Sequence, residues 1–219
     1  MNRMVAGAAV AVLMIAGASP ASAQAFGLPV TNSGLPTGIG LALDVGKPND
    51  AAGGGWSAGA TGKAGFGRFG LTGSVSLTKP SLNDDLWSTG ATANMQVFGG
   101  PLIPLSVNLQ AGAGFFSEDI ACIPEADCDP DRWHFPVGLG FAFTIPNPAM
   151  AIKPWVAPRL DIVRAGGTTH SNVGASAGVE LNFITGLGLH AAYDWVNGDV
   201  ADPGIFAAGL HYTFRVPGL

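Results

Sequence analysis

A period-two alternation of apolar and small or polar residues constrains this chain more than any other feature. The segment 133–145 shows the alternation most clearly. Its apolar set is Trp133, Phe135, Val137, Leu139, Phe141, Phe143 and Ile145. Its small or polar set is His134, Pro136, Gly138, Gly140, Ala142 and Thr144. Successive side chains of a β-strand point to opposite faces, so this pattern predicts a strand with one apolar face.

The same texture recurs along most of the chain. We expect strands over 37–46, 55–64, 68–78, 87–98, 105–116, 133–145, 152–164, 172–183, 186–195 and 205–214. Strands of about ten residues with a single apolar face are typical of a membrane-spanning barrel whose outside meets lipid. The predicted fold class is therefore all-β, a single antiparallel up-and-down transmembrane barrel of about ten strands, with eight strands as the alternative.

The connections and the aromatic residues give the barrel an orientation. Longer polar connections (47–54, 79–86, 117–132, 165–171 and 196–204) alternate with shorter ones (65–67, 99–104, 146–151 and 184–185). Outer-membrane barrels have long outer loops and short periplasmic turns. This assignment puts Trp56, Trp87, Phe115, Trp133 and Trp195 at the outer strand ends, and Phe69, Phe98, Phe143, Phe183, Tyr212 and Phe214 at the periplasmic ends. Two such aromatic girdles are typical of membrane barrels.

The N-terminus reads as a secretory signal. Arg3 precedes the uncharged run 4–18, and Ala21-Ser22-Ala23 is a small-residue cleavage site, so residues 1–23 are predicted to be removed. Residues 24–36 show no period and form a periplasmic leader or plug segment, and 37–219 form the barrel domain. The localisation expected is the bacterial outer membrane.

Composition excludes other classes. Only 11% of residues are charged, and the mean hydropathy is +0.34, whereas an ordinary soluble surface is about a quarter or more charged. Removal of Arg3 with the signal changes the net charge from −5 to −6. No basic patch suited to nucleic acid is visible.

One segment conflicts with a regular ladder. Pro158 is central in the strand predicted over 152–164, and proline removes a ladder hydrogen bond. A β-bulge at Pro158 would accommodate it and would turn Trp155 and Ala157 outward to lipid.

The last strand carries a resemblance to a known class. It reads Ala207-Ala208-Gly209-Leu210-His211-Tyr212-Thr213-Phe214. Here the chain resembles bacterial outer-membrane β-barrel proteins, in particular the small OmpA-like and OmpW-like families, whose last strand carries a Gly, alternating aromatics and a final Phe. Gly209, Tyr212 and Phe214 match that pattern, although five residues follow the Phe. The resemblance implies that the barrel assembly machinery reads this strand.

Few charged residues are predicted to face the lumen. A three-residue turn at 184–186 would place Glu180 opposite His190 and Ser176 opposite Asp194. Arg159, Asp161, Glu180, His190 and Asp194 would then form one lumen cluster. The cluster is interpreted either as a selectivity constriction or as a polar group that holds the interior together.

The loop 117–132 holds six acids and both cysteines. Cys122 and Cys128 are expected to form a disulfide after export, and no metal or cofactor is expected. The sequence lacks the GxSxG and HExxH motifs, so no enzyme is expected; His134 and His170, near the outer rim, are what an outer-leaflet enzyme would use.

Three functions are compatible with these sequence features. The first is a narrow passive channel for ions or small polar solutes. The second is a closed structural or adhesive barrel that acts through its outer loops, and the third is an outer-leaflet enzyme. The partners expected are outer-membrane lipid, the assembly machinery and small polar solutes, with no nucleic acid, and the protein is expected to be a monomer.

Overall fold

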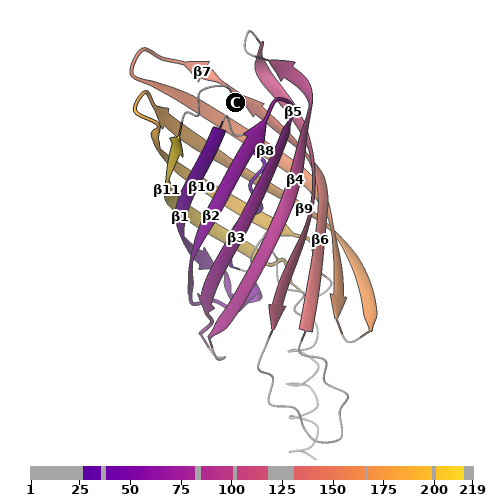
Figure 1. Ribbon diagram of the computed structural model, residues 1–219. Coiled ribbons are helices and arrows are strands. Elements are labelled where there is room, and N and C mark those ends of the chain that lie inside the picture. Colours follow the sequence, from indigo (N-terminus) through magenta and orange to yellow (C-terminus); the bar gives the residue numbers. More distant parts are fainter. Residues whose placement is uncertain are drawn as a thin grey trace, which may run out of the picture.

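The computed structural model describes residues 27–35, 38–81, 85–100, 103–117, 131–165, 167–198 and 201–214 (Figure 1). Its strands are β1 (Gly38–Pro48), β2 (Trp56–Phe66), β3 (Phe69–Lys79), β4 (Leu86–Gly100), β5 (Ile103–Ser117), β6 (Asp131–Phe143), β7 (Ile145–Pro146), β8 (Met150–Ala165), β9 (Thr168–Phe183), β10 (Leu187–Val196) and β11 (Gly204–Phe214). A short 3-10 helix, η1 (Asp50–Ala52), lies between β1 and β2.

The strands close into one antiparallel barrel. Each long strand pairs with its neighbours in the chain, β1 pairs with β11, and β6 pairs with β8 across the two-residue β7. Without β7, which only extends the ladder of β8, ten long strands surround the axis. The predicted fold class and the count of ten strands are confirmed, and the alternative of eight is wrong.

The two ends of the barrel differ. We call the end that carries the β1–β2, β3–β4, β5–β6, β8–β9 and β10–β11 connections the loop end, and the opposite end, where β1 begins and β11 ends, the turn end. The turn end is uppermost in Figure 1. The aromatic residues predicted for the two girdles lie at these two ends. Trp56 is the first residue of β2 and Trp87 the second of β4 at the loop end, and Phe143 and Phe214 end strands at the turn end.

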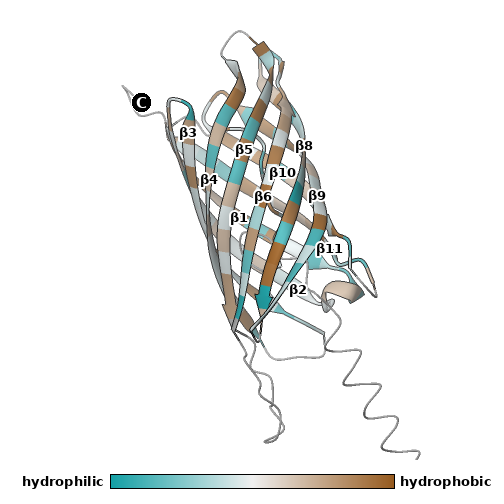
Figure 2. Cartoon of the chain, turned by 90° about the vertical axis from the view of Figure 1, so that its right-hand side faces the viewer, coloured by the Kyte–Doolittle hydropathy of each residue, from teal (hydrophilic) through white to brown (hydrophobic). Residues whose placement is uncertain are grey.

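The outer face of the wall is apolar. Leu43 and Trp87 each expose 66% of their surface, and Phe69 exposes 60%. In Figure 2, brown apolar and teal polar positions alternate along the strands. A large contiguous apolar surface of this kind is stable only against an apolar partner such as lipid.

No helix in the described part of the chain is long and apolar enough to cross a membrane.

The register of the β9–β10 hairpin is the predicted one. Gly186 has φ +90°, and its N–H donates to the Phe183 carbonyl at 3.0 Å. Glu180 pairs with His190, and Ser176 pairs with Asp194. The sequence prediction of these two pairs is confirmed.

The predicted bulge at Pro158 is wrong. The register of β8 against β9 runs without a shift through Pro158, opposite Ala175. Against β6, the pairs on the two sides of Pro158 are Gly138–Arg159 and Phe141–Val156, and they share the same register. The pairing is therefore interrupted at Pro158 without a shift. Trp155 therefore faces inward and is 5% exposed. Its indole lies where a Cβ at Gly178 would be, 2.8 Å from the Cζ2 atom, so the glycine opposite makes room for the ring.

Candidate functional site: the occupied lumen

A segment that belongs to no strand lies inside the barrel. Residues 27–35, here called the lumen segment, contact wall residues of β2, β5, β9 and β10. Its first residue, Gly27, lies beside Ser57 and Thr78 near the loop end. Gly34 lies beside Lys153 and Ser106 near the turn end. The segment therefore runs along the lumen toward the end where β1 begins, and its position is not confined to one mouth of the barrel.

The wall holds the lumen segment mostly by its main chain. The Val30 N–H donates to Asp194 Oδ2 at 2.7 Å, and the Val30 carbonyl accepts from Ser176 Oγ at 2.6 Å. The Thr31 carbonyl accepts from Gln110 Nε2 at 3.0 Å. Ser57 Oγ donates to the Gly27 carbonyl. Since an unpaired buried amide is costly, these wall side chains satisfy groups that a strand neighbour would satisfy in a sheet.

Glycines of the wall make space for side chains of the segment. A Cβ at Gly59 would lie 2.5 Å from Leu28 Cδ1, and one at Gly140 would lie 2.3 Å from Asn32 Cγ. Leu28 is 5% exposed and Val30 is 0% exposed, and both pack with Ala207. The interior that ten strands leave open is in this way filled by residues from the same chain.

A buried charged network lies beside the segment. Arg159 Nη2 contacts Asp194 Oδ1 at 2.6 Å, and Arg159 Nε contacts Asp161 Oδ2 at 2.8 Å. Asp161 Oδ1 in turn contacts His134 Nε2 at 2.6 Å. None of these four residues is more than 5% exposed. Buried charges persist only where they are paired, and this network joins β6, β8 and β10 to the Val30 N–H.

The other two residues of the predicted lumen cluster belong to separate groups. Glu180 accepts from Ser33 Oγ at 2.5 Å and lies 4.0 Å from Lys63 Nζ. His190 Nε2 contacts Asp44 Oδ1 at 2.5 Å, and its Nδ1 lies 3.0 Å from Nδ1 of His211. The prediction of one cluster of five residues is therefore corrected to three groups, because Ser33 of the lumen segment and Lys63 on β2 contact Glu180, and Asp44 on β1 contacts His190, inside the lumen.

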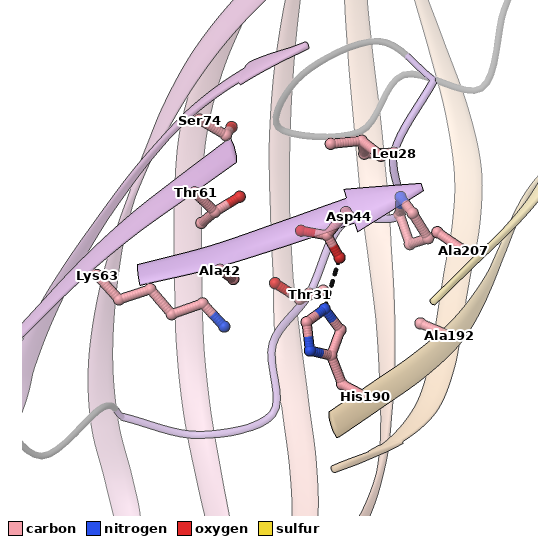
Figure 3. A pocket seen from close by; sticks show the side chains of 11 residues that line it. Leu28, Thr31, Ala42, Asp44, Thr61, Lys63, Ser74, His190, Ala192 and Ala207 are labelled. Atoms are coloured by element: carbon pink, nitrogen blue, oxygen red, sulfur yellow. Dashed lines mark hydrogen bonds and ion pairs between the residues drawn. The ribbon is translucent and has the colours of Figure 1, made fainter. Parts of the chain in front are cut away.

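A small cavity remains between the segment and strands β1–β3, β10 and β11. Figure 3 shows Leu28 at its upper side, Thr31 beside the Asp44–His190 contact, and Lys63 reaching toward the same space. Its volume is about 20 Å³, which is room for about one water molecule. The lumen as it stands has no solute-sized space at this point.

Of the three further residues singled out in the last strand, Tyr212 and Phe214 lie near its turn end and Gly209 lies at its middle. Tyr212 and Phe214 face outward with ring centroids 4.8 Å apart. A Cβ at Gly209 would lie 2.7 Å from Asp44 Oδ1 and 2.8 Å from His190 Nε2, so the glycine of the proposed assembly signal also makes room for that pair. Cys122 and Cys128 lie outside the described residues.

The two histidines considered for catalysis are placed differently. His134 is 1% exposed and points into the lumen toward Asp161, whereas His170 is exposed on β9. Among the described residues, no group of three or more His, Cys, Asp or Glu side chains is arranged to hold a metal ion.

Sequence reasoning missed two parts of this site. His134 was not assigned to the charged network, although it shares the inward parity of its strand. The contacts of residues 27–35 had no local signal, because a segment held by main-chain hydrogen bonds needs no periodicity. The two prolines and the uncharged composition of 24–36 are compatible with such a segment and do not specify it.

Comparison with known proteins supports the architecture. No family model matches the chain, and no curated protein has a similar sequence. The β domain of the Bordetella autotransporter BrkA is 16% identical, with a TM-score of 0.55 over 81% of this chain and 100% of that chain. The N-terminal barrel of Pseudomonas aeruginosa OprF is 12% identical over 82% and 98%, with a TM-score of 0.41. The Escherichia coli outer-membrane protease OmpT is 10% identical over 84% and 99%, with a TM-score of 0.42.

The likeness to the BrkA domain shows the fold, a closed antiparallel barrel of the outer-membrane type. Fold alone does not assign an activity. The class that fold and site define is a transmembrane-type β-barrel whose lumen is occupied by a segment of its own chain.

Proposed function

We propose that this protein is a bacterial outer-membrane channel for ions or small polar solutes that is closed by its own lumen segment. The observation that carries the proposal is that a polar inner wall surrounds a segment that forms no strand pairs with it. The wall interior is polar, as the lining of a water-filled channel is, and residues 27–35 lie in it without strand pairing. Displacement of the segment would leave a polar passage surrounded by the ten paired strands.

The charged side chains that line the emptied passage would act on permeating ions. Asp194 and Glu180 bind the segment through Val30 N–H and Ser33 Oγ. Without the segment, both carboxylates lose a hydrogen-bond donor and face the passage. Rings or groups of carboxylates favour cations in pores, so the open state is proposed to prefer cations.

Planar-bilayer conductance tests this proposal. Full-length protein, shown to be folded by heat-modifiable gel mobility, is expected to be closed for most of the recording. A variant that lacks residues 24–35 is expected to give discrete, long-lived conductance steps. Glu180→Gln in that variant should reduce the preference for cations. Steady conductance from the full-length protein, or silence from the folded deletion variant, contradicts the proposal.

A closed structural or adhesive barrel is the second candidate. The observation that favours it is the small size of the cavity beside Asp44 and His190, about 20 Å³. In that case the outer loops act, and removal of residues 118–131 should abolish a surface-binding phenotype while the barrel stays folded.

A further inference from the structure

The hydrogen bonds around the lumen segment are those of a bound peptide. Along residues 27–31, three carbonyls and one N–H are met by wall side chains: Ser57, Asp194, Ser176 and Gln110. Main-chain hydrogen bonds give a peptide site affinity without regard to sequence, whereas pockets for side chains give it specificity. The lumen offers both kinds of contact to these residues.

The pockets recognise alternate positions of the segment. Leu28 fits against Gly59, Val30 packs with Ala207, and Asn32 fits against Gly140. The segment Gly27–Leu35 carries no charge, which matches a wall whose Arg159, Asp161 and Asp194 are already paired with one another. A charged residue placed in this part of the lumen would be buried without a counter-ion, at high cost.

We propose that the lumen is a binding site for extended, uncharged peptides and that residues 27–35 are its resident ligand. A separate peptide competes for the same contacts if it repeats the pattern of Leu28, Val30 and Asn32, with two aliphatic side chains and an Asn at alternate positions. This proposal shares one assumption with the proposed function: in both, the lumen segment can leave the lumen.

The covalent link between the lumen segment and β1 explains why a free peptide would not displace the segment from the uncut protein. A covalently attached ligand acts at an effective concentration that reaches the order of millimolar for short linkers. A free peptide of moderate affinity therefore competes only after the tether is cut. The experiment must separate the segment from β1 without removing it before the barrel folds.

A cleavable form of the full chain meets this requirement. A protease recognition sequence is inserted between Pro36 and Thr37, the protein is folded in detergent micelles, and it is then cut. The probe is a fluorescent synthetic peptide, QAFGLPVTNSGLP, followed by anisotropy. We expect saturable binding that unlabelled peptide reverses. A scrambled peptide of the same composition should not bind measurably.

Two changes identify main-chain recognition. N-methylation of the peptide at the Val30 position removes the donor to Asp194 and should weaken binding by about tenfold. Ser176→Ala in the wall removes the donor to the Val30 carbonyl and should weaken binding by about two- to tenfold. Ser171→Ala is the matched control on the same strand, where the side chain is exposed, and should leave the affinity unchanged.

The outcomes separate this proposal from the channel proposal. If the cut segment does not exchange with the probe, the variant that lacks residues 24–35 is folded once with the peptide and once without it. If neither the cleaved protein nor the deletion variant binds the peptide, the peptide site is overturned. Equal binding of the scrambled and native peptides also overturns it. A folded deletion variant that conducts but is neither bound nor blocked by peptide supports only the channel. Peptide binding to a barrel that is silent in every state supports only the peptide site.

Discussion

Two regions of the lumen wall carry different kinds of polar group. The hydroxyl wall, on β2–β4, is lined by Ser57, Thr61, Thr72, Ser74, Ser76, Thr78, Ser88 and Thr92, all buried. The charged wall, on β6, β8 and β10, is lined by His134, Arg159, Asp161 and Asp194. A hydroxyl both donates and accepts and can rotate to a neighbour, as Ser76 and Ser88 do at 2.7 Å. A guanidinium or carboxylate needs a fixed partner of the opposite kind.

The interior is most vulnerable where its polar groups are charged. Loss of one member of the charged wall leaves a buried charge without its counter-ion, whereas loss of one hydroxyl leaves a neutral group that can turn to another partner. Substitutions in the charged wall should therefore cost several times more stability than substitutions in the hydroxyl wall.

The largest expected effect is that of Arg159→Met. It leaves Asp161 and Asp194 buried without the guanidinium that contacts both, and the free energy of unfolding should fall by about 3–5 kcal/mol. Denaturant unfolding from lipid vesicles measures the change. Arg164→Met is the matched control, because Arg164 lies on the same strand and is exposed. Equal losses in the two variants would show that the charged wall contributes no special stability.

A smaller effect is expected where β11, β1 and β10 meet beside the two walls. Gly209→Ala places a Cβ 2.3 Å from the Leu43 carbonyl oxygen and 2.7 Å from Asp44 Oδ1. Such overpacking costs about 1–3 kcal/mol and should separate Asp44 from His190. Gly73→Ala is the control, since a Cβ there meets no atom within 4 Å. The same unfolding assay applies, and a Gly209→Ala protein as stable as the parent would contradict the packing described.

The smallest effect is expected in the hydroxyl wall. Ser76→Ala and Ser88→Ala each remove the same 2.7 Å hydrogen bond and should each cost about 1 kcal/mol. The double variant should lose less than the two single losses together, because one interaction is counted in both. Strictly additive losses would mean that the two hydroxyls are not coupled.

The outer wall could be predicted from the sequence because its rule is local. Lipid requires an apolar residue at every second position, so the parity of residues such as Leu71 and Phe141 follows from their neighbours. The β9–β10 register followed for the same reason, since a three-residue turn with Gly186 fixes it. Pro158 was misjudged because its backbone accommodates a missing donor without changing the register.

The interior could be predicted only in part because its rules are not local. That Arg159 and Asp194 come together depends on β8, β9 and β10 standing side by side, which the strand order supplies. That Asp161 takes His134 as a partner depends on the register of β6 against β8, and no spacing in the sequence shows that register. The position of Val30 depends on all of these strands at once.

The pairing of β1 with β11 limits how the lumen segment can move. This ladder, from Ile39–Phe214 to Pro48–Ile205, joins the first strand to the last and is the seam of the cylinder. The lumen segment precedes β1 in the chain, so it is tethered to one of the two strands that form the seam. Once the seam is formed, the segment is surrounded by hydrogen-bonded wall and can exit only along the axis. The seam thus leaves motion along the barrel axis as the route by which the segment, or a competing peptide, enters or leaves the closed cylinder.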